Sequence, residues 1–538
     1  MKPFASGGFM SQSCLNFAVA IDKNHILSPL PHIWRSIGYD EINWTYTPTG
    51  KSIFARIAAL ADKPYYIRNH NTFTSGNCLS YPAWGSTNVY QEDERGNPKY
   101  DWSTIDKVFD VITAANCLPI VELGFMPRAL AQVPPEAYKN ANSLVIGLYD
   151  PAASYPPRDY QRWQDLVYQF ASHCLDRYGS QVFDWRFELW NEPDLTYYWM
   201  GGIENYCKLY DHSAAAIKAV DERLKIGGPA VAFGVDFLDQ FLRHCASGNN
   251  AVTGKTSTPL DFISFHLKGT HWPAPGMPVQ PSWMQMFNAM QRFCQVIRQH
   301  PSLAHLPVYI DECDIDVGTI LGVYDNPSLE YRNSEYYATF LCRLSKLCLD
   351  AAQAQQIHLE LITTWAYYFE GKRAFEGNRT LFDYAGLEKP VFQAFRLLSQ
   401  LGNQRLKLTV DGQADAAAEV DGLASVSPDG SIAIAVWNFV EDPSATTDAN
   451  VHLQVSGITE KNIRKLHYRI DQDHSNTYTL WKGLGRPEFP SEAQMNVLAA
   501  VQGLELLEPP QVIETNSGGL SFHLKLPPHS VSLILLRP

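Results

Sequence analysis

The sequence predicts an α/β protein, a (β/α)8 TIM barrel with a C-terminal β-sandwich domain. Short apolar runs alternate with longer helical patterns up to about residue 401, and short alternating runs separated by turn residues follow. A chain of 538 residues is long enough for both parts. We therefore expect an N-terminal segment at 1–24, a barrel at 25–401 and a β-sandwich at 402–538. Whether the first segment adds a strand to the sandwich is left open.

Eight apolar runs are predicted as the barrel strands, because they are short, rich in aliphatic and aromatic residues, and bounded by turn residues. In chain order they are 34–42, 63–70, 117–125, 184–190, 225–231, 261–266, 307–312 and 359–365. Eight alternating strands match the barrel whose active sites lie at the carboxyl ends of the strands.

The stretches between these strands have the periodicity of helices. The clearest are 102–115, 158–177, 203–219, 237–245, 283–299 and 335–352. A helix after a strand returns the chain to the start of the next parallel strand, as βαβ units require.

The last part of the chain has the pattern of antiparallel strands. Runs at 431–437, 451–455, 467–470 and 531–535 are separated by Gly, Pro, Asn and Asp. An earlier run at 15–21 precedes the first barrel strand and is the segment that could join this sheet.

The composition narrows the possible partners and locations. A net charge of −13 argues against nucleic acid or an anionic membrane as a partner. No apolar run approaches the roughly 18 residues of a membrane span. The start lacks a signal-peptide pattern, and the ten cysteines form no CxxC pair, so we expect free thiols and a cytoplasmic protein, with the periplasm as the alternative.

Two strand ends carry the residues that indicate chemistry. Trp190-Asn191-Glu192-Pro193 ends the fourth predicted strand, and Glu312 ends the seventh. A single glutamate is usually a solvated surface residue, but two at strand ends of a barrel can face one another across its mouth. Paired carboxylates that flank a glycosidic bond hydrolyse glycosides, with one as acid and the other as nucleophile or base.

Other motifs argue against other functions. Gly248–Thr256, GNNAVTGKT, is one residue too long for a phosphate-binding loop and follows a helical pattern, so we expect no nucleotide there. The sequence has no GxGxxG, GxSxG or HExxH motif. We expect no cofactor and no metal.

The strand-end residues and several further stretches resemble glycoside hydrolase family 39, which contains β-xylosidases and α-L-iduronidases. The matching stretches are YIRNHNTFTSG at 66–76, VELGFMP at 121–127, WRFELWNEPD at 185–194, IGGP at 226–229, DFISFHLKG at 261–269, VYIDE at 308–312, KPVFQAF at 389–395 and GRPEFP at 485–490. WNEP alone is shared by a clan, whereas the set covers nearly the whole chain and is typical of the family.

The resemblance implies a retaining mechanism in which Glu192 is the acid/base and Glu312 the nucleophile. It implies further sugar contacts: Asn191 would bond the 2-hydroxyl, and Trp365 would form an apolar floor under the sugar. His70 and His266 would complete the substrate-binding set. The alternatives are purely structural roles: Asn191 as a turn residue, His70 and His266 as core histidines, and Trp365 as a core tryptophan.

Lys268 and Arg379 resemble the iduronidase version of the family, in which a lysine and an arginine hold a sugar carboxylate. They could equally be surface cations or partners of Asp or Glu. VELGFMP and FELWNEPD are closer to bacterial xylosidases. The leading hypothesis is therefore an exo-acting β-xylosidase for xylo-oligosaccharides; the alternatives are a uronide hydrolase and a non-catalytic carbohydrate-binding protein.

Overall fold

The computed structural model describes residues 14–79, 85–139, 150–270, 277–318, 321–365, 372–412, 418–515 and 519–538. The chain divides into two compact units. A barrel unit contains residues 32–329 and 347–387, and a sheet unit contains the chain up to residue 31, residues 330–346 and residues 388–538.

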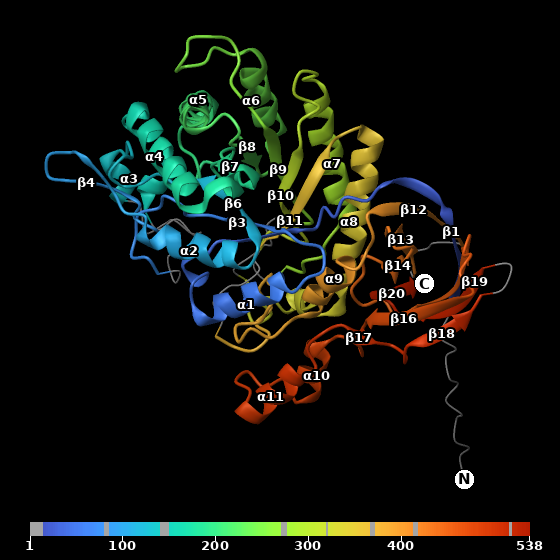
Figure 1. Ribbon diagram of the computed structural model, residues 1–538. Helices are drawn as coiled ribbons and strands as arrows, with labels where there is room; N and C mark the ends of the chain where they lie inside the picture. The colour runs from blue at the N-terminus through green and yellow to red at the C-terminus, as the bar shows by residue number, and fades with distance from the viewer. Residues whose placement is uncertain are drawn as a thin grey trace. The chain divides into compact units, whose positions relative to one another are not determined.

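Eight parallel strands close into a barrel with the order β10-β11-β2-β3-β6-β7-β8-β9 (Figure 1). The strands are β2 (Ser36–Tyr39), β3 (Tyr65–Asn69), β6 (Cys117–Leu123), β7 (Arg186–Leu189), β8 (Ile226–Val231), β9 (Phe262–Lys268), β10 (Val308–Asp314) and β11 (Leu359–Trp365). Each overlaps one of the eight predicted runs, so the predicted barrel is confirmed.

Helices follow most of these strands, as βαβ units require. They are α1 (Pro48–Ala58), α2 (Ser103–Ala114), α4 (Tyr160–Tyr178), α5 (Gly202–Val220), α6 (Val235–Ser247), α7 (Trp283–Arg298) and α8 (Glu335–Gln355), with the short α3 (Pro135–Lys139) and the hairpin β4 (Tyr90–Glu92) and β5 (Pro98–Tyr100) between them. Their sequences explain their limits: Asp159 caps α4 by accepting the amides of Gln161 and Arg162, and α6 buries Leu238, Phe241 and Leu242 on one face.

The interior of the barrel is apolar at one level and polar at the next. Tyr66, Ile120, Phe262, Tyr309 and Leu361 form a buried apolar cluster. Because side chains alternate along a strand, the residues two positions further on face the same interior. Those at the next step include Arg68, Glu122, Ser264 and Thr363, all buried. The strand period therefore places a layer of polar and charged side chains, called the charged layer below, directly above an apolar one.

The predicted sandwich takes the form of one ten-stranded sheet that curls on itself. Its strands besides β1 are β12 (Gln404–Asp411), β13 (Val420–Val426), β14 (Ile432–Asn438), β15 (Asp448–Ser456), β16 (Asn462–Ile470), β17 (Glu505–Leu506), β18 (Gln511–Glu514), β19 (Leu520–Leu526) and β20 (Ser530–Arg537). Helices α9 (Pro390–Leu398), α10 (Thr477–Gly483) and α11 (Glu492–Ala500) belong to the same unit. One apolar cluster draws residues from most of the strands, so a single core serves the whole sheet.

Strand β1 (Cys14–Pro29) answers the question that the sequence left open for the first residues. It pairs parallel with β15 and antiparallel with β12, in the middle of the sheet. Phe17, Val19 and Ile21 alternate into the core with period two, as the run at 15–21 suggests.

The nine cysteines whose side chains the structure describes are free thiols, in agreement with their scatter along the sequence. All but Cys78 are buried. Among the helices of the described ranges, none combines the length and the apolar character that a bilayer crossing needs.

A close approach in the barrel gives a test of its packing. A Cβ on Gly38 in β2 would lie 1.9 Å from Cε3 of the Trp365 ring, so only glycine fits. We expect Gly38→Ala to lower the free energy of unfolding of the barrel by about 1–3 kcal/mol, as overpacking does. Chemical denaturation followed by tryptophan fluorescence measures this loss.

The control is the double variant Gly38→Ala/Trp365→Phe, which removes the ring atoms that the new methyl group meets. The loss of unfolding free energy in the double variant should be smaller than the sum of the losses in the two single variants. Additive losses would show that the ring is not what excludes a side chain at position 38.

Candidate active site

The predicted site residues lie at the carboxyl ends of the barrel strands or just beyond. Asn191 and Glu192 follow β7, His70 follows β3, and Trp365 ends β11. His266 and Lys268 belong to β9, and Glu312 to β10; Arg379 comes from the segment after β11. Residues from five strands thus converge at one mouth of the barrel, where βα barrels place their chemistry.

A β-bulge in β10 brings Glu312 into the interior. Ile310 pairs with Phe265 and Glu312 with His266, so Asp311 is an extra residue in the register. Strict alternation would point Asp311 and Glu312 to opposite sides. Both contact Arg68 instead, at 3.4 and 3.3 Å, because the bulge re-aims the strand.

Glu192 is held in an unusual backbone conformation. Its φ is 45°, and Trp190 before it also has a positive φ, of 68°. The Glu192 amide donates to the carbonyl oxygen of Ala230, at 2.9 Å, which fixes the turn. Non-glycine residues in this region cost energy, and such strain is concentrated at functional sites.

The Glu192 carboxyl favours its protonated form. Burial, followed by the negative charge of Glu312, raises the pKa of Glu192 to about 7. Its Oε1 lies 2.8 Å from Nδ1 of His266. Burial lowers the pKa of His266 to about 3, so the imidazole that shares this hydrogen bond with Glu192 is neutral.

The Glu312 carboxylate favours its ionised form. Burial alone would raise its pKa, but the cations around it, above all the Lys268 ammonium, hold the pKa well below the usual range. Lys268 Nζ donates to Oε2, and Nε2 of His70 lies 3.5 Å from Oε1. Burial opposes a charge on His70, yet Glu122 and Asp40 raise the pKa of that imidazole to about 10.

Glu192, His266 and Glu312 each place a side-chain donor atom within 4.8 Å of the others. The Lys268 ammonium already places a positive charge against the Glu312 carboxylate of this group. A protonated carboxyl and an ionised one at this spacing can protonate one atom of a bond and attack the other.

Arg68 connects these groups and is absent from the residues that the sequence singled out. Its guanidinium is fully buried, with Nε 2.6 Å from Glu188 Oε2 and Nη2 3.1 Å from Asn191 Oδ1. That contact fixes the Asn191 amide so that its Nδ2 is a donor without a hydrogen-bond partner among the described residues. Asn191 therefore keeps an amide N–H that is available to a further acceptor.

Trp365 and His70 share one acidic partner. Trp365 Nε1 donates to Asp40 Oδ2 at 3.1 Å, and Asp40 Oδ1 lies 2.8 Å from His70 Nδ1. The two rings lie 4.4 Å apart at 33°. Trp365 is only 2% exposed, so it packs against the charged layer and Gly38 as well as bordering the site.

Lys268 and Arg379 meet on a single carboxylate, that of Asp314. Lys268 Nζ lies 2.5 Å and Arg379 Nη2 3.1 Å from Asp314 Oδ2. Arg379 also donates to the main-chain oxygen of Asp316. The two cations predicted to act together therefore do converge, on an acidic residue of the chain itself.

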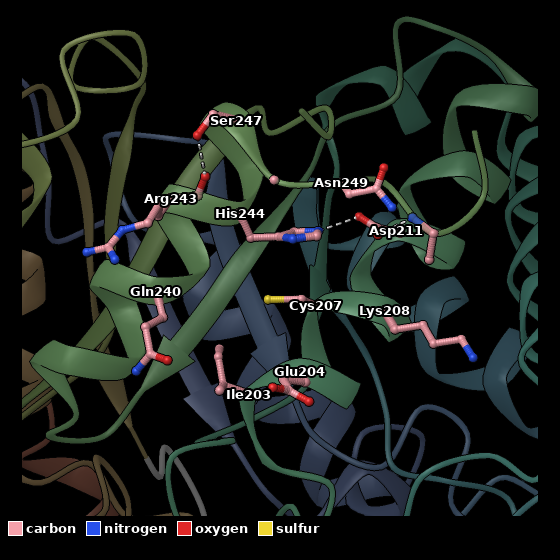
Figure 2. A pocket seen from close by; sticks show the side chains of 12 residues that line it. Ile203, Glu204, Cys207, Lys208, Asp211, Gln240, Arg243, His244, Ser247 and Asn249 are labelled. Atoms are coloured by element: carbon pink, nitrogen blue, oxygen red, sulfur yellow. Dashed lines mark hydrogen bonds and ion pairs between the residues drawn. The ribbon is translucent and has the colours of Figure 1, made fainter. Parts of the chain in front are cut away.

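The open cleft in Figure 2 lies outside the barrel, between α5 and α6, and contains none of the predicted site residues. Part of the segment 248–256 borders it. Asp211 accepts the amide of Ala251 at 2.7 Å and faces His244 Nε2 at 2.8 Å. A carboxylate of the chain thus takes a loop amide that a phosphate would need, in line with the rejection of a nucleotide site.

Comparisons with known proteins identify a family. A family model described as glycosyl hydrolases family 39 matches residues 19–510. A β-xylosidase of Geobacillus stearothermophilus is 28% identical over 457 residues, which cover 81% of this chain and 80% of that protein. An α-L-iduronidase of Mus musculus is 26% identical over 406 residues, covering 69% and 61%.

Solved structures share the fold. A monomeric β-xylosidase from Caulobacter crescentus CB15 aligns with a TM-score of 0.78 and 22% identity over 97% of this chain and 99% of that one. A bacterial orthologue of human α-L-iduronidase aligns with a TM-score of 0.79 and 23% identity over 98% and 84%. The family match at residues 19–510 covers most of the chain and reaches into both the barrel unit and the sheet unit. The chain therefore belongs to glycosyl hydrolases family 39 and is a glycoside hydrolase.

Proposed function

We propose that the chain is a retaining exo-β-xylosidase that releases terminal xylose from xylo-oligosaccharides. The observation that carries the proposal is the pair formed by Glu192, which favours its protonated form, and Glu312, which favours its ionised form. A carboxyl oxygen of Glu192 lies within 4.8 Å of a carboxyl oxygen of Glu312. Retaining glycosidases hold their carboxyls about 5–5.5 Å apart, whereas inverting enzymes leave room for a water at about 6.5–9.5 Å.

In the first step the Glu312 carboxylate attacks the anomeric carbon while the bond to the leaving oxygen breaks. Glu192 gives its proton to that oxygen, and a glycosyl ester of Glu312 remains. The ester carries no charge, so the repulsion that helps to raise the pKa of Glu192 is gone. Glu192 is then suited to take a proton from water, which attacks the anomeric carbon and frees Glu312.

The neighbouring groups suit this sequence of steps. The Asn191 amide, held by Arg68, is placed to donate to a sugar 2-hydroxyl beside the nucleophile. His266 shares a hydrogen bond with Glu192 as a neutral imidazole, so it adds no positive charge that would favour the ionised form of Glu192. His70 and Trp365 complete the sugar-binding wall that we propose.

Two observations favour a neutral pentose. Lys268 and Arg379 are matched by Glu312, Asp314 and Asp316, which leaves no surplus positive charge for a substrate anion. Relatives named β-xylosidase, from Geobacillus stearothermophilus and Caldicellulosiruptor saccharolyticus, align over 81% and 83% of this chain.

The free thiols support a reducing compartment, the cytoplasm, as the location.

One observation favours a second candidate, a uronide hydrolase. Lys268 and Arg379 already grip one carboxylate together, and this is the arrangement that would hold the carboxylate of a uronic acid. Relatives named α-L-iduronidase are also similar to the chain.

The nucleophile assignment predicts that Glu312→Gln lowers kcat for an aryl β-xyloside by at least about 10⁴-fold with an unchanged unfolding temperature. Glu192→Ala should retain turnover of substrates with good leaving groups and respond to added azide, which replaces water as the attacking species. Product anomers identified by NMR check retention. Unchanged turnover in Glu312→Gln would rule out Glu312 as the nucleophile, whereas a parent chain that turns over no glycoside would be a carbohydrate-binding protein on this scaffold.

The opposite states of the two glutamates predict the pH profile. Because Glu192 must start protonated, kcat/KM should fall as pH rises through its pKa of about 7. Because Glu312 must start ionised and its pKa is lowered, the acid limb should lie below the range of an ordinary glutamate. In Glu312→Gln the pKa of Glu192 should drop, as followed by NMR titration, since one cause of its elevation is removed. A pKa that stays in place would contradict the coupling.

Lys268→Met separates the two substrate candidates. Loss of the ammonium raises the pKa of Glu312 and should shift the acid limb upward for every substrate. For a β-xylosidase, kcat/KM for aryl xyloside far exceeds that for aryl iduronide or glucuronide in the parent chain. For a uronide hydrolase, kcat/KM is higher for the uronide than for the xyloside in the parent chain. Lys268→Met should then lower kcat/KM for the uronide about 100-fold more than kcat/KM for the xyloside. Lys255→Met, at an exposed lysine, is the control.

A further inference from the structure

Asp194, two residues after Glu192, binds the segment between β8 and α6 through its main-chain amides. Oδ1 of Asp194 accepts the amide of Ala232 at 2.9 Å, and Oδ2 accepts the amides of Phe233 and Gly234 at 3.0 and 2.8 Å. Three N–H groups thus converge on one carboxylate, which makes the contact strong and directional. The double displacement itself makes no use of this carboxylate.

Gly234 shows how closely Asp194 fits against this segment. It is the residue before α6, and its lack of a side chain leaves room for the carboxylate at the end of the helix where a negative charge is favoured. A Cβ on Gly234 would lie 2.8 Å from Cβ and 2.9 Å from Oδ2 of Asp194. A larger residue at position 234 would therefore push the Asp194 side chain away.

The ends of β7 and β8 are joined a second time through Glu192 itself. The Glu192 amide donates to the carbonyl oxygen of Ala230, and both residues have a positive φ, of 45° and 54°. Non-glycine residues in this conformation cost energy and persist only where the surrounding structure holds them. Asp194 supplies three such bonds beside this strained pair.

The position of the Glu192 carboxyl depends on this junction. Ala230 donates its amide to Ser264 Oγ at 3.1 Å, and Ser264 lies on β9, the strand that carries His266. His266 Nδ1 is in turn 2.8 Å from Glu192 Oε1. A general acid must lie within hydrogen-bond reach of the atom that it protonates, and a displacement of about 1 Å can cost about 100-fold in rate.

We propose that Asp194 is a positioning residue: by binding the amides of residues 232–234 it holds the ends of β7 and β8 together, and so keeps the Glu192 carboxyl in reach of the leaving oxygen. The inference rests on the proposed retaining mechanism and is the same for a xyloside and a uronide. It predicts a defect in proton transfer to the leaving group, whereas a merely structural residue would affect all substrates equally.

The dependence on the leaving group tests the inference. Asp194→Asn is close in shape but turns an NH2 group toward main-chain amides, so one acceptor is lost. Xylobiose has a basic leaving oxygen that needs the proton, whereas dinitrophenolate departs with little help from an acid. We expect kcat/KM to fall about 30-fold for xylobiose and to stay within about twofold for dinitrophenyl β-xyloside.

The ratio of these two kcat/KM values is the decisive quantity. Measured on one preparation, it does not depend on the fraction of the chain that is correctly folded. Gly234→Ala displaces Asp194 without removing its charge, and should change the ratio in the same direction. The two substitutions act on one contact, so Gly234→Ala/Asp194→Asn should change the ratio by less than the product of the single effects.

Asp261→Asn is the matched control. Asp261 accepts the amide of Ile226 at 2.8 Å, at the opposite, amino end of β8, and so makes the same kind of bond away from Glu192. Its loss should leave the ratio unchanged.

Equal losses for both substrates in Asp194→Asn, or an equal change of the ratio in Asp261→Asn, would overturn the inference. If Asp194→Asn does not fold, the ratio in Gly234→Ala decides instead. A parent chain that cleaves no glycoside would show that the proposed function is wrong, and the inference would fall with it. A parent chain that cleaves both substrates, with a ratio that Asp194→Asn does not change, would contradict the inference alone.

Discussion

The buried guanidinium of Arg68 is the interaction on which the barrel mouth depends. Acidic residues reach this guanidinium from β6, β7 and β10, and all of them are buried, so water does not solvate their charges. A buried charge is tolerated only with a partner at short distance. The position of Arg68, two residues after the apolar Tyr66 on β3, therefore determines which carboxyls can ionise and where they must lie.

This constraint also gives Glu192 and Glu312 different surroundings. Glu312 lies among Lys268, Arg68 and His70, whereas Glu192 faces a neutral imidazole and the negative charge of Glu312 itself. Identical side chains thus acquire opposite protonation states from their neighbours. The two states also depend on each other, because the negative charge of Glu312 is one of the causes that raise the pKa of Glu192.

Much of the fold could be predicted from the sequence because the strand signal is local. All eight barrel strands and the two glutamates lie where apolar runs and their ends place them. The charged layer was missed, since Arg68, Glu188 and Asp311 look like ordinary charges inside YIRNH, RFELW and YIDEC. The available signal was that a charge within a buried barrel strand has to meet a partner. The bulge at Asp311 and the curling of the second sheet depend on contacts between distant strands, which periodicity does not contain.

The position of β1 has a consequence for the order in which the protein can be assembled. Its partners β12 and β15 begin at Gln404 and Asp448, after all eight strands of the barrel. During synthesis, the first strand of the chain leaves the ribosome long before either neighbour exists. The apolar residues of β1 must stay unpaired, or be shielded by a chaperone, while several hundred residues are translated. The sheet unit is therefore the part of the molecule that cannot form around β1 until the strands that follow the barrel have been translated.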